Sequence, residues 1–390
     1  MQRTSSYLLV LLITAFLAAT VAAAEPDAGG FVPLFNGNDL TGWVLTNTPP
    51  ATWTFQDGML ICSGKPVGEL RTERMYQNFI MELEWRHMVP RGNAGIFIWA
   101  DDITARGVPF HRGIEVQVLE NAYGNSQSHT THGDIFPIHG ATMTPINGRG
   151  GDRAFPTEER SKPSPEWNHY QITCQDGEIS LAVNGKVVTQ GKDCSPRKGY
   201  ICLESEGGIV HYRNVRIKPL PDTPVDAAHV AIANRGYRSI YTGLDLSGWT
   251  GEPAAVEAWR VGDWVLSCGG SKDGNDATLV TTEQFGDVGF VFDARIKEAG
   301  KPLQVRLRNA TIETNDPAIA KHLEKAGSWN RFEGTLRGNL LTLSVNGHEA
   351  FQDRAVEKLA DRGPFAISPA GPTDFANIYA RELSATATAP

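Results

Sequence analysis

The chain has 390 residues, which is too long for one ordinary domain and long enough for two. Acidic residues outnumber basic ones by 44 to 36, and the resulting net charge of −8 argues against nucleic acid or an anionic membrane surface as a partner. The 40 glycines and 23 prolines favour many short strands joined by turns over long helices.

The first 24 residues have the order of a secretory signal peptide. A short segment with one positive charge, Arg3, precedes an almost wholly apolar run over residues 7–20, and Ala22-Ala23-Ala24 supplies small residues for cleavage before Glu25. The alternative, a retained membrane anchor, needs a longer apolar run. We therefore expect an exported protein, periplasmic or extracellular, with no membrane span after processing.

The remaining chain repeats itself. Residues 34–43 return as 241–249, Trp53 returns as Trp259, residues 167–185 return as 329–347, and residues 212–215 return as 375–378. Four landmarks in one order indicate a duplicated domain. We predict a first domain over residues 31–219, a linker over 220–236 and a second, degenerate domain over 237–385 that serves as an accessory.

Each copy is predicted to be all-β. Alternating apolar and polar residues predict strands over 79–86, 113–119, 170–174, 178–183 and 210–217. Asp176-Gly177 and Asn184-Gly185 are typical of tight hairpin turns. Short antiparallel strands without a long amphipathic helix favour two tandem jelly-roll β-sandwiches, of the concanavalin or laminin-G type.

The alternation also assigns side chains to faces. Leu83, Trp85, Val116, Val118 and Tyr212 are expected in the core, so that their neighbours point the other way. If the strands are neighbours, one sheet face carries a polar floor made of Glu84, Arg86, Glu115, Gln117, Glu204, Glu206, His211 and Arg213.

The second copy lacks much of this floor. Arg295 and Trp329 are 34 positions apart in the second copy, whereas Arg86 and Trp167 are 81 positions apart in the first. No carboxylate stands where Glu204 and Glu206 stood, and Ala376 replaces Arg213. Because the core landmarks persist while polar residues disappear, we predict that the functional site belongs to the first domain.

Several residue sets could perform chemistry. Glu115 and Gln117, outward on one strand, can reach one ligand together, although a solvated sheet face gives the same pattern. Asn93 follows a turn and could donate to a sugar hydroxyl. His129, His132 and His139 invite a metal site, yet their spacing matches no zinc signature, and His132 with Asp134 could instead form a proton-transfer pair.

The five cysteines leave two interpretations open. Four of them, Cys62, Cys174, Cys194 and Cys202, lie in the first copy, and an exported protein can form disulfides. None has the spacing of a thiolate zinc site, and buried free thiols in strands are an equally good interpretation.

An ordered set of motifs resembles one known family. The motifs span about residues 31–220, and they are Leu34-Phe35-Asn36-Gly37, Gly42-Trp43, Glu84-Trp85-Arg86, Gly92-Asn93-Ala94-Gly95-Ile96, Glu115-Val116-Gln117, Trp167-Asn168 and Tyr212-Arg213-Asn214-Val215. They are similar to the 3-keto-disaccharide hydrolases, also described as 3-keto-glucoside lyases and hydratases. The resemblance implies a concanavalin-like jelly roll. The chain departs from the family pattern at Glu204-Ser205-Glu206-Gly207, where members often carry Gln-Asp-His-Gly, and at Ala94, where serine is common.

The resemblance implies a chemistry for the floor. A ketone at sugar C3 acidifies the C2 hydrogen, a base removes it, the C1 substituent leaves by β-elimination, and water adds back. The base would be Glu115 or His132, with Glu84 close by. Arg86 and Arg213 would bind oxygens, while Gln117, Asn93 and Asp134 would bind the sugar.

A divalent metal held by Glu204, Glu206 and His211 would serve as a Lewis acid, and no nucleotide cofactor is expected. Two alternatives stay open: a non-catalytic carbohydrate-binding module, and a glycosidase that uses Glu84 and Glu115 as its carboxylate pair.

Overall fold

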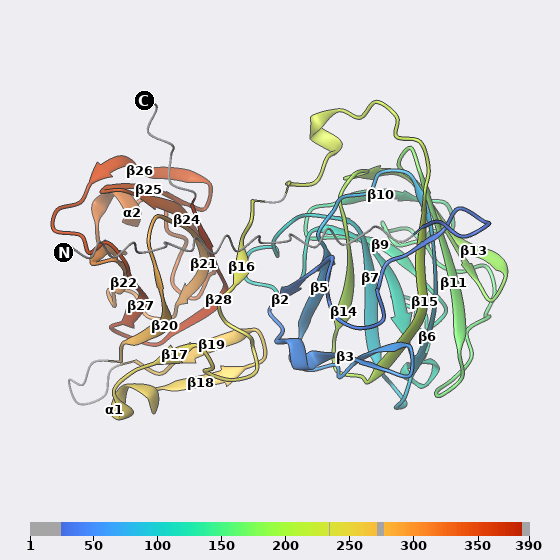
Figure 1. Cartoon of the computed structure of the whole chain (residues 1–390), viewed down its shortest axis with the longest axis horizontal. Helices are drawn as coiled ribbons and strands as arrows, with labels where there is room; N and C mark the ends of the chain where they lie inside the picture. Colours follow the sequence, from blue (N-terminus) through green and yellow to red (C-terminus); the bar gives the residue numbers. More distant parts are fainter. Residues whose placement is uncertain (1–24, 234, 271–276, 384–390) are drawn as a thin grey trace, which may run out of the picture.

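The structure, a computed structural model, describes residues 25–233, 235–270 and 277–383. Two lobes of β-structure lie side by side (Figure 1). The expected signal peptide lies outside the described residues. Within them, helix is confined to single turns, which are α1 (Pro253–Val256), α2 (Pro317–Ala320), η1 (Pro50–Thr52), η2 (Asn121–Tyr123) and η3 (Ala227–His229). No helix in the described ranges is long and apolar enough to cross a membrane.

The first lobe, called the first sandwich, consists of two antiparallel sheets. The nine-stranded sheet contains, in spatial order, β10 (Thr142–Pro145), β13 (Lys186–Ser195), β12 (Glu178–Val183), β11 (Asn168–Gln175), β6 (Phe79–His87), β15 (Val210–Pro219), β4 (Met59–Cys62) and β3 (Trp53–Gln56), with β1 (Val32–Pro33) paired to β15. The six-stranded sheet contains β2 (Trp43–Thr46), β5 (Gly68–Thr72), β14 (Tyr200–Ser205), β7 (Asn93–Ala100), β8 (Gly113–Leu119) and β9 (Ile135–Ile138).

The second lobe, called the second sandwich, has the same architecture with fewer strands. Its eight-stranded sheet contains β18 (Trp259–Gly262), β19 (Val265–Cys268), β28 (Thr373–Glu382), β21 (Val288–Ile296), β24 (Asn330–Arg337), β25 (Leu340–Val345) and β26 (His348–Ala355), with β16 (Arg238–Ser239) paired to β28. Its five-stranded sheet contains β17 (Trp249–Thr250), β20 (Leu279–Phe285), β27 (Gly363–Pro369), β22 (Leu303–Leu307) and β23 (Ala310–Glu313). The chain is therefore all-β, as the sequence predicts.

Each sandwich encloses its own apolar core between its two sheets. The residues predicted to face inward do so: Leu83, Trp85 and Tyr212 from the nine-stranded sheet meet Val116 and Val118 from the six-stranded sheet in one cluster. None of the five is more than 1% exposed. At about 25 cal/mol per Å² of apolar surface buried, such interdigitation supplies most of the stabilisation of a sandwich.

The predicted hairpin turns are also confirmed. Asp176 and Gly177 both have positive φ, at 52° and 84°, and so do Asn184 and Gly185, at 47° and 87°. A two-residue hairpin with the right-handed strand twist requires positive φ at both turn positions, which Asn, Asp and Gly adopt at least cost. These turns fix the register of β11, β12 and β13.

The prediction of one polar floor is wrong. The strands that carry Glu84 and Arg213, β6 and β15, are neighbours in the nine-stranded sheet. The strands that carry Glu115 and Glu204 lie in the six-stranded sheet, on either side of β7. Because the apolar core separates the two sheets, their outward faces lie on opposite sides of the sandwich. Alternation assigns a face within one strand, whereas long-range pairing decides which sheet the strand joins.

All five cysteines are free thiols and buried. Burial raises the pKa of Cys62 to about 11 and that of Cys194 to about 12. The interpretation of buried thiols in strands therefore holds for this structure, and the cysteines act as small apolar residues.

Candidate active site

The outward face of the six-stranded sheet carries a pair of facing carboxyl groups. Glu115 lies on β8 and Glu204 on β14, and β7 runs between these two strands. Glu115 is 8% exposed and Glu204 is 1% exposed, so both carboxyl groups are almost withdrawn from water. Carboxyl groups this deep are unusual in a sandwich and are costly unless they are protonated or paired.

A glycine on β7 makes the space that the two carboxyl groups share. A Cβ atom at Gly95 would lie 2.8 Å from Oε1 of Glu115 and 3.0 Å from Oε2 of Glu204. Both oxygens therefore face one point above the backbone of Gly95. Glycine inside a strand commonly marks such a close approach. Oε2 of Glu204 has no hydrogen-bond partner among the described residues, so it is available to a ligand at this point.

The pKa values of these carboxyl groups are raised toward neutrality or above it. The pKa of Glu115 rises to about 8, first through burial and then through the charge of Glu206, against an opposing effect of Arg153. Burial raises the pKa of Glu204 well above its ordinary value, and Glu115 raises it further. Burial also raises the pKa of Glu206 to about 7. The group titrates as a coupled set, so that protonated and ionised carboxyl groups coexist near neutral pH.

Two amide side chains, Asn93 at the start of β7 and Gln117 on β8, orient the site. Nε2 of Gln117 donates to Oδ1 of Asn93 at 2.9 Å and to the backbone oxygen of Ala94 at 3.2 Å. Nδ2 of Asn93 donates in turn to Glu206. Asn93, Gln117 and Glu206 thus form one connected set on the same face as Glu115. The structure brings together four of the residues that the sequence singled out, and Glu204 makes a fifth.

A partly buried ion pair lies beside Glu115. Asp134 is fully buried and accepts hydrogen bonds from the backbone N–H of Thr130 at 2.9 Å and from Nη1 of Arg153 at 2.9 Å. The guanidinium of Arg153 also stacks over the ring of Phe136, 3.4 Å from its centroid. The charges of Arg153 and Asp134 both act on the pKa of Glu115, the first lowering it and the second raising it.

His132 lies in a separate pocket. Its Nδ1 is 2.8 Å from Oγ of Ser161, and its Nε2 is 3.2 Å from both Asn125 and Glu159. His132, Asn125 and Glu159 line a surface cavity of about 490 Å³, and Glu115 is not among the residues that line it. The predicted pairing of His132 with Asp134 as a proton-transfer pair is wrong, because Asp134 is occupied by Arg153 and Thr130.

The other predicted site residues form a cluster on the opposite face. Arg213 makes a bidentate ion pair with Glu84, with both distances 3.0 Å, and its guanidinium lies 4.1 Å from the ring centroid of Trp167. Arg86 stacks on the same ring at 4.5 Å and faces Nδ1 of His211 at 3.3 Å. Burial and the charge of Arg86 lower the pKa of His211. The core separates this cluster from Glu115, so the expected roles of Glu84, Arg86 and Arg213 at the same substrate are wrong.

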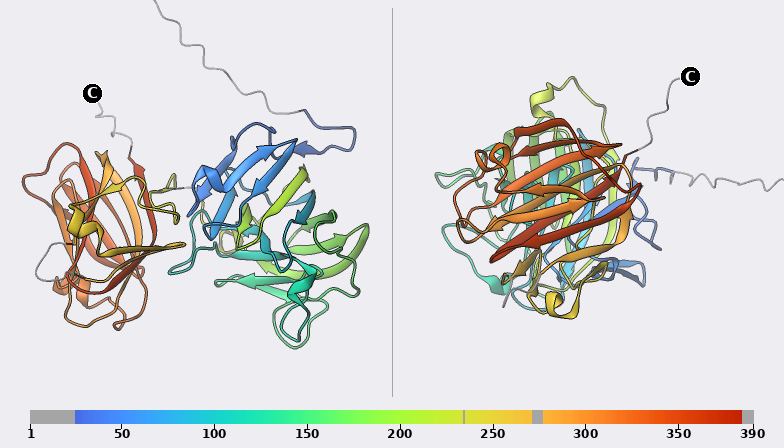
Figure 2. Two further views of the ribbon diagram at one scale, coloured as in Figure 1. Left: turned by 90° about the horizontal axis from the view of Figure 1, so that it is seen from below. Right: turned by 90° about the vertical axis from the view of Figure 1, so that its left-hand side faces the viewer.

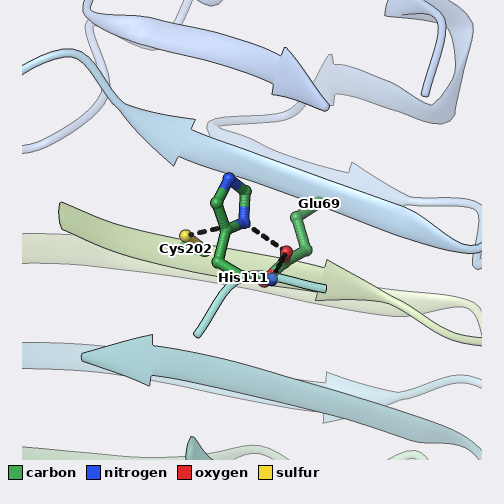
Figure 3. Close-up of side chains that lie close together, drawn as sticks. All are labelled: Glu69, His111 and Cys202. Carbon is green, nitrogen blue, oxygen red and sulfur yellow. Dashed lines mark hydrogen bonds and ion pairs between the residues drawn. The ribbon is translucent and has the colours of Figure 1, made fainter. Parts of the chain in front are cut away.

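The predicted metal ligands do not converge, because Glu204 and Glu206 lie at the six-stranded sheet and His211 lies on the nine-stranded one. Among the described residues, one set has donor atoms spaced for an ion: Glu69, His111 and Cys202, all fully buried (Figure 3). Glu69 accepts hydrogen bonds from both the backbone N–H and Nδ1 of His111. Burial raises the pKa of the Cys202 thiol well above its ordinary value. These hydrogen bonds hold His111 in place, while Oε1 of Glu69 and Nε2 of His111 are buried without a hydrogen-bond partner among the described residues.

A comparison with protein families finds one match, which lies in the first sandwich. Residues 30–218 match the model of the 3-keto-alpha-glucoside-1,2-lyase-like domain. The first sandwich is thus similar to this family, over slightly less than half of the chain. The matched residues coincide with the strands β1 to β15, and the second sandwich lies outside the match. The chain matches none of the curated proteins.

Solved structures similar to the chain each cover about half of it. A proposed glycosyl hydrolase from Parabacteroides distasonis is 23% identical, with 50% of this chain and 95% of that one covered at a TM-score of 0.39. A carbohydrate-binding module from Bacillus subtilis is 12% identical, with 46% and 96% covered at 0.34. A β-glucanase from Bacillus licheniformis is 14% identical, with 50% and 100% covered at 0.33.

Sequence reasoning missed Gly95, Glu69, His111 and Arg153. Gly95 had a usable signal, because a glycine inside an apolar strand indicates a close approach by another group. Arg153 lies in an irregular segment with no periodic pattern, and the contact between His111 and Glu69 joins residues 42 positions apart. No local pattern predicts such contacts.

Proposed function

We propose that the first sandwich is a 3-keto-glycoside lyase and hydratase, whose net reaction is cleavage of the glycosidic bond. The observation that carries the proposal is the pair of buried carboxyl groups facing one point above Gly95, with pKa values raised by burial and by each other. The family match supports the substrate class. A pair of coupled carboxyl groups can supply both the base that removes a proton and the acid that returns one.

Glu115 is assigned as the base that removes the C2 proton. With a pKa of about 8, its ionised form is a stronger base than an ordinary carboxylate and is present at mildly alkaline pH. The C2–H bond breaks, its electrons form the enolate, and the C1–O bond breaks as the aglycone departs with its electron pair. The C3 ketone re-forms as a C1=C2 double bond appears. Water then adds: its hydroxyl bonds to C1, its other proton goes to the aglycone alkoxide, and Glu115 returns the abstracted proton to C2.

Glu204 is assigned as the group that remains protonated. Its pKa lies well above the ordinary value, so its carboxyl group can donate a hydrogen bond to the developing enolate oxygen. Asn93 and Gln117 are assigned to the sugar hydroxyls, because their amides lie on the same face and are fixed by each other. A divalent metal at this oxygen would supply the same stabilisation, and a chelator separates the two possibilities.

The glycosidase alternative loses the pair on which it was based, because Glu84 and Glu115 lie on opposite faces of the sandwich. Glu115 and Glu204, which face one point above Gly95, are the pair that this alternative would use instead. The discriminating experiment offers the purified mature protein a 3-keto-glucoside and the unoxidised parent glucoside, each with and without chelator. Loss of only the keto substrate supports the proposal. Cleavage of the parent glucoside supports a glycosidase, and binding of either sugar without product supports a binding module.

We also propose that the chain is exported to the periplasm or beyond, on the basis of its first 24 residues. Amino-terminal sequencing of the protein recovered from a bacterial host tests this. A mature chain that begins at Glu25 supports export, and a cytoplasmic chain that retains residues 1–24 contradicts it.

A further inference from the structure

A loop of the first sandwich docks on the second. Residues 101–112 connect β7 to β8, and their tip reaches across to the eight-stranded sheet (Figure 2). The backbone N–H of Gly107 donates to Oδ2 of Asp293 at 2.8 Å. Nδ2 of Asn377 donates to the backbone oxygens of Ala105 at 3.0 Å and Val108 at 2.9 Å. Buried backbone groups paired in this way fix the path of a loop.

The fit between the loop and the second sandwich is also steric. Gly107 has a φ of +75°, and a Cβ atom there would lie 2.4 Å from two ring carbons of Trp329. Only glycine therefore allows the backbone to lie against the indole. At the base of the contact, Ile103 packs with Val291 and Tyr379 in a small buried cluster, and Oγ1 of Thr104 is 2.8 Å from the hydroxyl of Tyr379.

The duplication explains why the second sandwich can accept the loop. In the first sandwich Glu84 pairs in register with Arg213, and in the second Asp293 pairs in register with Ala376. Arg213 forms an ion pair with the carboxylate of Glu84, and its guanidinium lies over the ring of Trp167.

Because Ala376 has no such side chain, the corresponding carboxylate and indole accept Gly107 instead. Arg331 balances the charge of Asp293 from the side, at 2.7 and 2.8 Å. The missing arginine thus opens a socket, which we define as Asp293, Trp329, Ala376 and Asn377.

The base of the loop leads to the candidate site. Thr104 pairs with His111 across the loop, and His111 is held on Glu69 by its backbone and its ring. Glu69 lies directly opposite Glu204 in the register of β5 and β14. The charge of Glu69 also raises the pKa of Glu115. The docked loop, His111 and the row of carboxyl groups are therefore connected by direct contacts.

We infer that the second sandwich is a socket for loop 101–112, and that this docking positions His111 and Glu69 beside the carboxyl pair of the first sandwich. The accessory domain then serves the reaction without touching the substrate. Asp293 and Asn377 are positioning residues. The effect on turnover rests on the proposed function, whereas the docking itself does not.

The test compares two glycines with the same backbone conformation. Gly107→Ala adds a methyl group against Trp329, while Gly300→Ala adds one at a φ that is also +75° but with no atom within 4 Å. Both carry the same backbone strain, so only the first should release the loop. Asn377→Ala provides a second variant that acts from the socket side.

Amide hydrogen exchange of residues 103–111 is measured in the full-length protein. We expect roughly tenfold faster exchange in Gly107→Ala and Asn377→Ala and the wild-type rate in Gly300→Ala, because one or two hydrogen bonds are lost. On a 3-keto-glucoside, both socket variants should lose kcat with little change in KM. Equal exchange in Gly107→Ala and Gly300→Ala would overturn the docking. Faster exchange with unchanged kcat would overturn the positioning. A wild-type protein without turnover would overturn the proposed function, and hydrogen exchange would still decide the docking.

Discussion

Glu115→Gln should make the protein more stable while abolishing turnover. Glutamine has nearly the shape of glutamic acid and remains neutral at every pH. In the wild type, Glu115 has a pKa of about 8 in the folded protein against an ordinary value of 4.5. Between these two values the folded protein binds more protons than the unfolded chain, so the free energy of unfolding falls as the pH rises.

The magnitude follows from the difference between the two pKa values. Each pH unit above 4.5 costs about 1.4 kcal/mol until the folded-state pKa is reached. At pH 7 the wild type therefore loses roughly 3 kcal/mol through this carboxyl group. Glu115→Gln avoids the loss, so its advantage should be close to zero near pH 4, rise through neutrality and level off above pH 8.

Urea denaturation followed by circular dichroism, at several pH values, measures this difference. Glu158→Gln is the control, because Glu158 is an exposed carboxyl whose pKa is lowered by Lys186 and Arg160. Its substitution should give no stabilisation at any pH. If Glu115→Gln is no more stable than the wild type at pH 8, then burial does not raise the pKa of Glu115 and the assignment of the base fails.

Three further outcomes are expected. Gly95→Ala should lower turnover about a hundredfold, because its methyl group fills the space between the carboxyl groups of Glu115 and Glu204. The thermal midpoint of unfolding should hardly move, since the flexible ends of the two glutamate side chains can yield. Unchanged turnover would contradict the site. The kcat should rise with pH through an apparent pKa between about 7 and 8, as Glu115 loses its proton, and a profile that falls across this range would exclude a carboxylate base there. Arg213→Ala should leave turnover unchanged, because this arginine lies on the opposite face from the carboxyl pair, and a large loss in a steady-state assay would return it to the mechanism.

Local patterns in the sequence predict much of the fold. Alternation identified β6 and β8 almost to the residue, and Asn184-Gly185 predicted its hairpin, because both signals depend on neighbours in the chain. The inward positions of Trp85 and Val116 followed from the same alternation.

The site could be predicted only in part, because it depends on which strands become neighbours. Glu115, Gln117 and Asn93 were found from their positions in strands that do pair with each other. Glu84 and Arg213 were placed beside them wrongly, since their strands pair in the other sheet. The loss of an arginine at Ala376 suggested a decayed site, and only the contact with Gly107 reveals the socket.

The central claim is that the carboxyl pair at Gly95 cleaves 3-keto-glycosides. The most direct measurement is the loss of a 3-keto-glucoside with the mature wild type and with Glu115→Gln, beside the unoxidised glucoside as control. We predict turnover of the keto sugar by the wild type alone and no cleavage of the parent glucoside. Equal turnover by Glu115→Gln, or cleavage of the parent glucoside at the same rate, would contradict the account.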